Sequence, residues 1–503
     1  MHRKEKNMKL KRTIASLSAL ALLVGGVTGC KKAEETGAGE PVTLKYVMPG
    51  PGMQEDSQKV WAAFNEKLHE KLPNVTVEFE VIPTSEYNKK FNLMCTAREQ
   101  IDIVNAYWLG DSKQARNGTF EPLDDLLKKY GKDITNTLPE WLMEYGKVDG
   151  QIYTIPSYQM CGSFRGIVFI KEQAEKYLDI EKFKGALWST PTFNQETYDI
   201  LTKYMEDLKA NGINFKSATV MSMKGRENIT GHDYAIDYLD EKAQLKANYI
   251  DEVSKMRYKV AREWAEKGFI RPDELSATDD ESYKGKVDGY PFWDVTYTPF
   301  LEESLSEKYG VDVLVIPYEN YYYTGFNNSA SGTAIMSTSK YKEQAMQVIN
   351  LLQTDKELYN LLVFGIEGDH YTKIGEDRIS TATNESPTSN DRYGLYKWIV
   401  GNTSMAYDLE TEPEEYKKWV FEEANMSDKR SPLIGFKPDT EPVADYITQV
   451  SSVRDKYEQP LLTGSIEDWE AFYEEFKTQM NKVGNEQVLE ELQRQIDEFL
   501  KTK

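Results

Sequence analysis

Hydrophobic positions near the start of the chain alternate between strand-like and helix-like spacing. Apolar side chains fall at every second position over residues 42–48 and 75–81, and a short apolar run follows at 101–104, which is typical of β-strands. Residues 56–68 and 87–94 instead place apolar side chains three and four positions apart, as on one face of a helix. This β-α-β-α-β order predicts a doubly wound α/β lobe with a mainly parallel sheet.

Two loops follow the first and third predicted strands, where ligands of such sheets bind. They are residues 49–54 and the sequence Asn105-Ala106-Tyr107-Trp108. The neighbouring rings of Tyr107 and Trp108 fit a binding surface, and they fit packing beneath the loop equally well.

The length of 503 residues exceeds what one core usually supports, so we expect two lobes. Residues 153–157 and 331–336 are short strand-like segments at which the chain would cross between the lobes. From about Glu412 the sequence is helical in pattern and highly charged. We assign residues 41–157 and 328–365 to the N-terminal lobe, and residues 158–327 and 366–503 to the C-terminal lobe.

The N-terminus carries the pattern of an export signal. Six Lys or Arg residues in Met1–Thr13 precede an apolar run, Ile14–Val27, that is too short for a permanent membrane helix. Translation could equally begin at Met8. The sequence Val27-Thr28-Gly29-Cys30 resembles the lipobox of bacterial lipoproteins, which implies a signal peptide over residues 1–29 and acylation of Cys30.

Residues 31–40 are polar and contain glycine, so we expect a flexible tether. Two acyl chains hold a protein firmly at a bilayer. The expected location is therefore the extracellular face of the cell membrane, with a lipid anchor at Cys30.

Composition excludes several function classes. The formal net charge of −21 leaves no basic surface suited to nucleic acid. Four scattered histidines and three cysteines provide neither a helical metal motif nor a disulfide framework, so we expect no metal and no cofactor. Cys95 and Cys161 could pair, although two free thiols are the preferred interpretation.

Several motifs resemble the family 1 extracellular solute-binding proteins of ABC importers. They are Thr333–Lys340, Gln344–Gln347, Leu351–Asp355, Phe120–Asp124 and Asp149–Pro156. A narrower resemblance is to the LplA-like lipoproteins of Gram-positive bacteria, which have a C-terminal region of uncharacterised role. Its marks are Leu358–Gly368, His370-Tyr371, Trp398, Gly401-Asn402, Ser431–Phe436 and Asp439–Val443. Asp369 departs from this pattern, since a basic residue is expected there.

The resemblance implies a two-lobed, periplasmic-binding-protein-like fold of type II, with discontinuous lobes, a hinge and a helical C-terminal region. It also implies capture of a sugar, most simply an oligosaccharide, for the permease subunits of an ABC importer. We expect a monomer that is not an enzyme. A peptide-binding lipoprotein remains the alternative, and a secreted glycoside hydrolase is a more remote one, because acidic residues are too common here for a carboxylate pair to be informative.

A sugar ring needs flat aromatic surfaces for its C–H face and polar side chains for its hydroxyl groups. The densest aromatic stretch is Tyr290–Tyr297, which could equally be a core strand. The aromatic candidates are Tyr107, Trp108, Tyr158, Trp188, Trp293, Tyr297, Tyr322 and Phe326. The polar candidates are Gln54, Gln159, Arg165, Asp294, Asn327 and His370.

Overall fold

The computed structural model describes residues 40–503, apart from 163, 222–223, 232, 239, 279–282, 320–321, 325–330, 384–385 and 390–391. Residues 41–503 form one compact unit. The predicted signal peptide and Cys30 lie outside the described residues. Within the described ranges, no helix combines the length and the apolar character needed to cross a bilayer.

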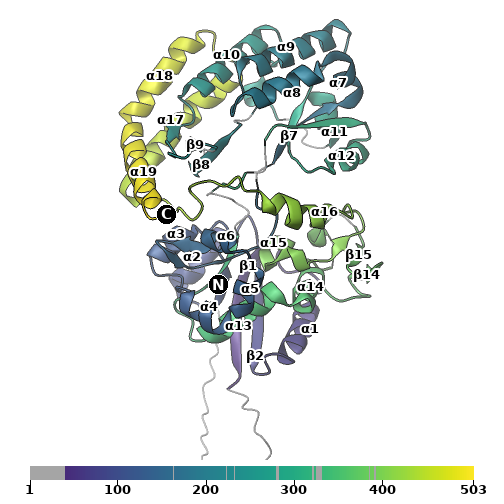
Figure 1. Cartoon of the computed structure of the whole chain (residues 1–503), viewed down its shortest axis with the longest axis vertical. Helices are drawn as coiled ribbons and strands as arrows, with labels where there is room; N and C mark the ends of the chain where they lie inside the picture. The colour runs from purple at the N-terminus through teal and green to yellow at the C-terminus, as the bar shows by residue number, and fades with distance from the viewer. Residues whose placement is uncertain are drawn as a thin grey trace, which may run out of the picture. The chain divides into compact units, whose positions relative to one another are not determined.

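A five-stranded sheet organises the first lobe, in the order β2-β1-β3-β13-β6 (Figure 1). The strands are β1 (Val42–Gly50), β2 (Val75–Pro83), β3 (Ile103–Asn105), β6 (Ile155–Pro156) and β13 (Gly332–Ile335). β1 pairs in parallel with β2 and β3, whereas β13 is antiparallel to β3 and β6. The predicted parallel opening is therefore confirmed, and the returning strand reverses the direction.

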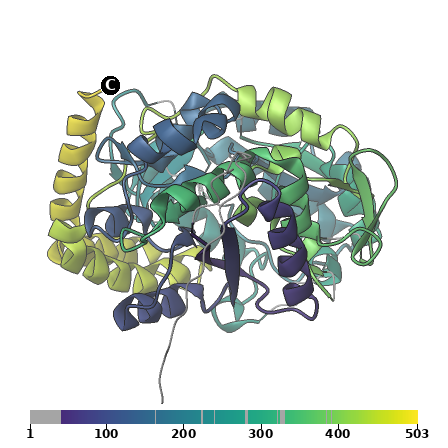
Figure 2. The same ribbon diagram turned by 90° about the horizontal axis from the view of Figure 1, so that it is seen from below.

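Helices cover this sheet with the apolar faces that the sequence predicted. α1 (Ser57–His69) buries Val60, Trp61, Phe64 and Leu68, and it packs against β2 and α14 (Figure 2). The remaining elements of this part of the chain are α2 (Tyr87–Ala97), α3 (Asp111–Arg116), α4 (Asp124–Tyr130), α5 (Lys132–Thr137), α6 (Glu140–Met143), β4 (Lys147–Val148), β5 (Gln151–Ile152), α13 (Lys342–Thr354) and α14 (Lys356–Phe364).

The segment from Tyr371 to Leu409 also packs into the first core, which corrects our assignment of residues 366–503 to the other lobe. It contains β14 (Tyr371–Lys373), β15 (Arg378–Thr381), α15 (Lys397–Val400) and β16 (Asp408–Leu409). α14 holds this segment: Tyr359 Oη donates to the Lys397 carbonyl at 2.8 Å, and Asn360 Nδ2 donates to the Met405 carbonyl at 2.8 Å. These long-range contacts assign residues 371–409 to the first lobe, and no local sequence pattern reports them.

The second lobe is built on a three-stranded antiparallel sheet, β11-β7-β12. Its strands are β7 (Arg165–Ile170), β11 (Trp293–Thr296) and β12 (Val313–Pro317). The helices of this lobe are α7 (Lys171–Tyr177), α8 (Ile180–Ser189), α9 (Gln195–Ala210), α10 (Glu252–Glu266), α11 (Tyr283–Gly289) and α12 (Leu301–Tyr309). Trp264 is fully buried in its core, as its helical face predicts.

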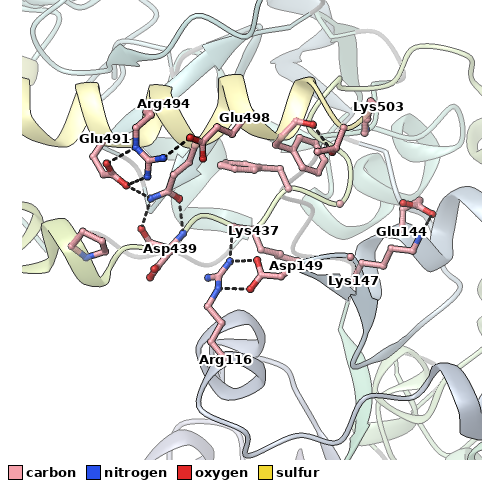
Figure 3. A pocket seen from close by; sticks show the side chains of 17 residues that line it. Arg116, Glu144, Lys147, Asp149, Lys437, Asp439, Glu491, Arg494, Glu498 and Lys503 are labelled. Atoms are coloured by element: carbon pink, nitrogen blue, oxygen red, sulfur yellow. Dashed lines mark hydrogen bonds and ion pairs between the residues drawn. The ribbon is translucent and has the colours of Figure 1, made fainter.

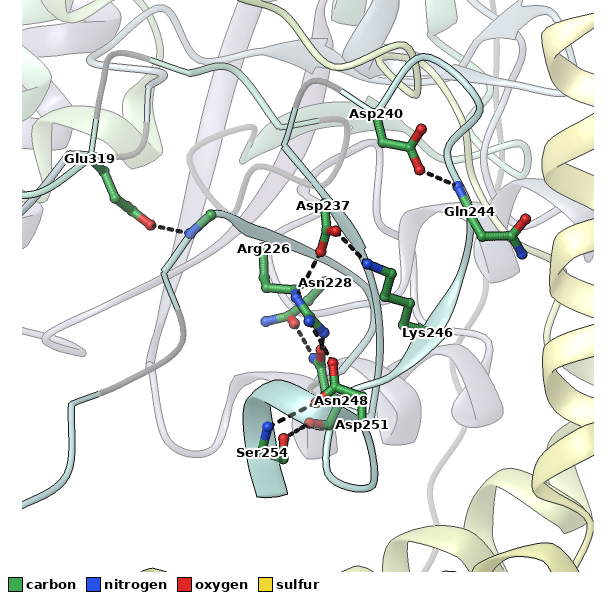
Figure 4. A network of polar contacts seen from close by, with 11 residues as sticks. Arg226, Asn228, Asp237, Asp240, Gln244, Lys246, Asn248, Asp251, Ser254 and Glu319 are labelled. Carbon is green, nitrogen blue, oxygen red and sulfur yellow. Dashed lines mark hydrogen bonds and ion pairs between the residues drawn. The ribbon is translucent and has the colours of Figure 1, made fainter. Parts of the chain in front are cut away.

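The C-terminal helices share a third core with a second small sheet of this lobe (Figure 1). The helices are α17 (Ala444–Leu462), α18 (Trp469–Lys482) and α19 (Asn485–Leu500); the strands are β8 (Arg226–Thr230), β9 (Tyr234–Asp237) and β10 (Lys246–Ala247). Arg226, only 3% exposed, lies between the carboxylates of Asp237 and Asp251 and ties this sheet to α10 (Figure 4). The C-terminal region is thus part of the second lobe's body.

The two predicted crossings lie side by side, because β6 pairs with β13. The Ser157 amide donates to the Ser331 carbonyl at 2.8 Å, and Ser157 Oγ donates to the Trp398 carbonyl at 2.5 Å. A third stretch, residues 424–431, runs beside them: Asn425 Nδ2 donates to the Gln159 carbonyl at 2.7 Å. It follows α16 (Tyr416–Lys418) and the wider helical turn Trp419–Glu423. Sequence analysis missed this third connection, which reaches its partners only through tertiary contacts.

Candidate functional site

The loops after β1 and β3 meet at one edge of the first sheet, because the two strands are parallel neighbours. Asn105, fully buried, fixes the second loop: its Oδ1 accepts from the Tyr107 amide at 3.0 Å, and its Nδ2 donates to the Ile399 carbonyl at 3.1 Å. Trp108 follows with a positive φ of 60°. Its indole is 57% exposed, so the loop presents this ring to solvent.

Four aromatic side chains form what we call the aromatic row: Tyr396, Trp398, Tyr107 and Trp108. The ring centroids of Tyr396 and Trp398 lie 5.6 Å apart, those of Trp398 and Tyr107 4.7 Å, and those of Tyr107 and Trp108 4.3 Å. Only Trp108 is largely exposed; the other three are half-buried. Each ring packs against the next, so the four together form an apolar surface at the carboxyl ends of the strands.

A small pocket of about 290 Å³ continues from this row toward the crossings. Its lining includes Trp398, Gln159, Thr403 and Phe421. Gln159, a predicted ligand-binding residue, therefore borders a cavity. Tyr158 does not line it: the ring is buried, 4.8 Å from that of Phe421, and the Tyr158 carbonyl accepts from the Thr403 amide at 2.8 Å. Tyr158 thus belongs to the framework of the hinge.

The second lobe carries a larger pocket of about 440 Å³ at the C-terminal end of α8. We call it the Trp188 pocket; it is lined by Trp188, Ser189, Thr190, Pro191, Lys224, Gly225, Tyr238, Tyr318, Glu319, Tyr322 and Lys429. Trp188 is 43% exposed. The Tyr238 and Tyr322 rings stack at 4.1 Å, which leaves Tyr322 buried as support for its partner. The pocket thus combines an exposed indole with hydroxyl, ammonium and carboxylate groups.

Lys224 holds the wall of this pocket. Its Nζ donates to the Leu187 carbonyl and, at 2.9 Å, to the Thr190 carbonyl, and it lies 5.2 Å from the Trp188 ring centroid. Burial lowers the pKa of Lys224 to about 8, and the nearby Glu319 carboxylate partly offsets this. Glu319 Oε1 in turn accepts from the Gly225 amide at 3.1 Å. These contacts fix the orientation of Trp188.

Arg165 and Asp294 pair with each other beside this pocket. Arg165 Nη2 lies 2.6 Å from Asp294 Oδ2, and Tyr318 Oη donates to Asp294 Oδ1 at 2.8 Å. Burial alone lowers the pKa of Arg165, but the Asp294 carboxylate outweighs it and the net shift is upward. The guanidinium stays charged, and the two predicted polar residues are brought together as one neutral unit.

Other predicted residues serve the framework of the protein. Trp293 is 6% exposed, and its indole nitrogen donates to Tyr309 Oη at 3.0 Å. Of the two interpretations of the stretch Tyr290–Tyr297, the structure thus agrees with a core strand at Trp293. His370 is buried, with Nδ1 accepting from the Ile366 amide at 2.9 Å and Nε2 3.1 Å from Asp56 Oδ2.

Gln54 Oε1 accepts from the Gly394 amide at 3.0 Å, which ties the loop after β1 to the segment before α15. Tyr297 is half-buried between the second-lobe sheet and the helical turn at Trp419. Asp369, the departure from the family pattern, pairs with Lys59 Nζ at 2.6 Å. Phe326 and Asn327 lie outside the described residues.

Sequence reasoning missed Trp398, Tyr396, Tyr238 and Glu319 as site residues. Trp398 lies 291 positions after Tyr107 in the sequence but 4.7 Å away between ring centroids. The sequence offered one indication that Trp398 has a functional role: it belongs to a motif shared with the LplA-like lipoproteins. Among the described residues, no three His, Cys, Asp or Glu side chains gather as metal ligands would, and Cys95 and Cys161 are both free thiols.

Known proteins are similar to this chain over almost its whole length. A carbohydrate ABC transporter substrate-binding protein of Streptococcus pneumoniae serotype 4 is 26% identical over 512 residues, covering 99% of this chain and 100% of the relative. The crystal structure of the N-glycan transport solute-binding protein NgtS from Streptococcus pneumoniae matches with a TM-score of 0.73 at 22% identity, over 92% of this chain and 99% of that one. NgtS in complex with Man5GlcNAc gives 0.64 at 23% identity, with the same coverage.

Two families account for most of the sequence. Residues 432–501 match a domain of unknown function, DUF3502. Residues 50–358, more than half of the chain, match the bacterial extracellular solute-binding proteins, and the two lobes agree with that fold. The chain therefore belongs to the family of bacterial extracellular solute-binding proteins.

Proposed function

We propose that this protein captures an oligosaccharide between its two lobes and delivers it to an ABC importer. The observation that carries the proposal is the pair of exposed indoles, Trp108 on the first lobe and Trp188 on the second. Each ring is fixed by neighbours, and each stands beside polar groups. A sugar ring buries a few tens of Å² of C–H surface on one such ring, which is worth about 1 kcal/mol. Several rings are therefore needed, and a ligand of several units suits them.

The relatives support this substrate class. The pneumococcal relative is named for carbohydrate transport, and NgtS has been crystallised with Man5GlcNAc. We infer by analogy that the importer's permease subunits are the protein partners of this chain.

Lipidation of Cys30 completes the proposal. The residues Val27–Cys30 follow a basic segment and a short apolar run, so the mature protein would begin at an acylated cysteine and remain on the outer face of the membrane. We expect it to act there as a monomer. Incorporation of labelled palmitate that is lost in the Cys30→Ala variant would support this. Labelling that persists in that variant would exclude Cys30 as the anchor.

Ligand binding is coupled to hinge closure in this proposal. A ligand that touches both indoles binds more tightly to the closed arrangement, which brings them together, than to the open one. Binding therefore shifts the equilibrium between open and closed lobes toward the closed state. Small-angle scattering should report a more compact protein when ligand is added. An unchanged profile with a tight ligand would contradict closure.

Calorimetric titration of the protein from residue 31 onward tests the binding function. The panel contains xylo-, manno-, gluco- and galacto-oligosaccharides, together with a matched set of peptides. Saturable binding of one sugar class, with the sugar recovered intact, supports the proposal. Binding of peptides alone would establish a peptide receptor, and recovery of cleaved sugar would establish a hydrolase.

A further inference from the structure

The segment from Ser431 to Glu441, which we call the strap, links the C-terminal domain to the first lobe. On the second-lobe side it is held by α19: Gln495 Nε2 donates to the Asp439 carbonyl at 2.9 Å, and Gln495 Oε1 accepts from the Asp439 amide at 2.8 Å. The Phe436 and Phe499 rings lie 5.4 Å apart on the same side. One amide side chain therefore satisfies both backbone groups of one strap residue.

The two strap residues just before Asp439 are held by the first lobe. Arg116, the last residue of α3, donates from Nη2 to the Lys437 carbonyl at 2.8 Å and from Nη1 to the Pro438 carbonyl at 3.2 Å. Asp149 orients the guanidinium through contacts of 3.0 and 2.9 Å (Figure 3). The Lys437 ammonium lies 3.0 Å from the Asp111 carboxylate. Hydrogen bonds from a charged donor are stronger than those between neutral groups.

α19 moves with the second lobe, because it is bonded into the sheet of that lobe. The Leu245 amide donates to Gln493 Oε1 at 2.8 Å, and Tyr234 Oη donates to Asn485 Oδ1 at 3.2 Å. The strap is therefore bonded to both lobes at neighbouring residues: to the first lobe at Lys437 and Pro438, through Arg116, and to the second lobe at Asp439, through Gln495.

A groove of about 840 Å³ separates the facing walls beside the strap. Charges in each wall are paired within that wall: Lys147 lies 2.5 Å from Glu144, and Arg494 lies 2.6 Å from Glu491 (Figure 3). Lys503, at the end of the second-lobe wall, donates to the Pro432 carbonyl of the strap at 2.9 Å. The strap therefore has contacts with both walls of the groove.

We propose that the C-terminal domain is an interlobe brace: through the strap it stabilises the arrangement of the lobes seen here, and it opposes hinge motion away from it. Rotation of the second lobe about the crossings pulls the strap against its contacts with the first lobe. Loss of the Arg116 contacts or of the Gln495 contacts weakens the restraint, while the Lys437–Asp111 ion pair and the chain that runs on into α17 remain. The role concerns the conformational equilibrium and requires no contact between the domain and a ligand.

Spin-label distance measurements on the ligand-free protein test the brace. Labels are placed by Lys89→Cys on the first lobe and Lys182→Cys on the second, both exposed, in the protein from residue 31 onward, which lacks Cys30, with Cys95→Ser and the buried Cys161 retained. The variants are Arg116→Ala, Gln495→Ala and the two combined. Lys128→Ala is the control, because it is an exposed lysine of α4 in the first lobe that is not among the strap contacts described above.

Each single variant should move the interlobe distance distribution, with the equilibrium constant changing about tenfold for loss of one charged clamp. The double variant should move the distribution at least as far as either single variant. The Lys128→Ala protein should match the parent. Unchanged distributions in both single variants would overturn the brace, and so would an equal shift in the Lys128→Ala protein. Gln495 is half-buried on α19, so we expect the Gln495→Ala protein to fold. It therefore tests the brace even if the Arg116→Ala protein does not fold. The measurement contains no sugar, so its outcome is separate from that of the titration panel.

Discussion

Replacement of Trp108 by alanine should weaken ligand binding while it leaves the fold almost unchanged. The indole is 57% exposed and touches mainly Tyr107, so truncation removes little intramolecular packing and should cost less than about 1 kcal/mol of unfolding free energy. Alanine meets the same positive φ, so the backbone gains no new strain. A stacked sugar ring would lose its apolar surface and the fixed aromatic face, together ~1–2 kcal/mol, or a roughly 5- to 30-fold rise in Kd.

The assay is calorimetric titration with the sugar class found in the panel, alongside thermal unfolding of the same samples. Trp293→Ala is the matched control, because that indole is 6% exposed and hydrogen-bonded. Its removal should cost about 3–5 kcal/mol of stability, while the protein that remains folded keeps its affinity. A Kd within twofold of the parent in Trp108→Ala would refute the role of the aromatic row.

Three further predictions concern stability and reactivity. Arg226→Ala removes the buried cation between the half-buried Asp237 and Asp251, of which Asp237 keeps Lys246 as a partner, and should cost about 2 kcal/mol, measured by urea unfolding at neutral pH (Figure 4). Burial raises the pKa of Glu458 from 4.5 to about 7, so the folded state holds more protons than the unfolded chain between those values. This group's contribution is fully present below pH 4.5 and is lost as the pH rises through about 7. Relative to the parent, Glu458→Gln should therefore gain stability from pH 5 to 8, and parallel stability curves would contradict the assignment. Burial raises the pKa of the Cys161 thiol to about 12, so iodoacetamide should modify it only after unfolding, whereas the half-buried Cys95 should react slowly in the native protein. Mass spectrometry of native and urea-treated samples would distinguish the two sites.

The outcome for individual residues shows where sequence reasoning stopped. Trp108 and Trp293 both follow or form short strands, and nothing in their local sequence separates an exposed platform from a core side chain. The pairing of β11 with β7 places Trp293 in the core, whereas Trp108 lies in the loop after β3 and is exposed. Arg165 and Asp294 were both predicted as polar site residues, but only the strand register, which sets Asp294 opposite Ile167, shows that they neutralise each other.

Local periodicity was sufficient for the elements themselves. The alternation from Val42 to Met48 and the helical spacing from Val60 to Leu68 report burial on one side of a single element, and the sequence carries that directly. The basic segment, the apolar run and Cys30 likewise define an export pattern without reference to any fold.

Tertiary structure alone decided which lobe receives residues 371–409, and it alone brought Trp398 beside Tyr107 and the strap beside Arg116. The physical reason is the same in each case. Burial and pairing of these residues depend on partners far away in the chain, whereas a sequence pattern reports only neighbours within a few turns or strand positions.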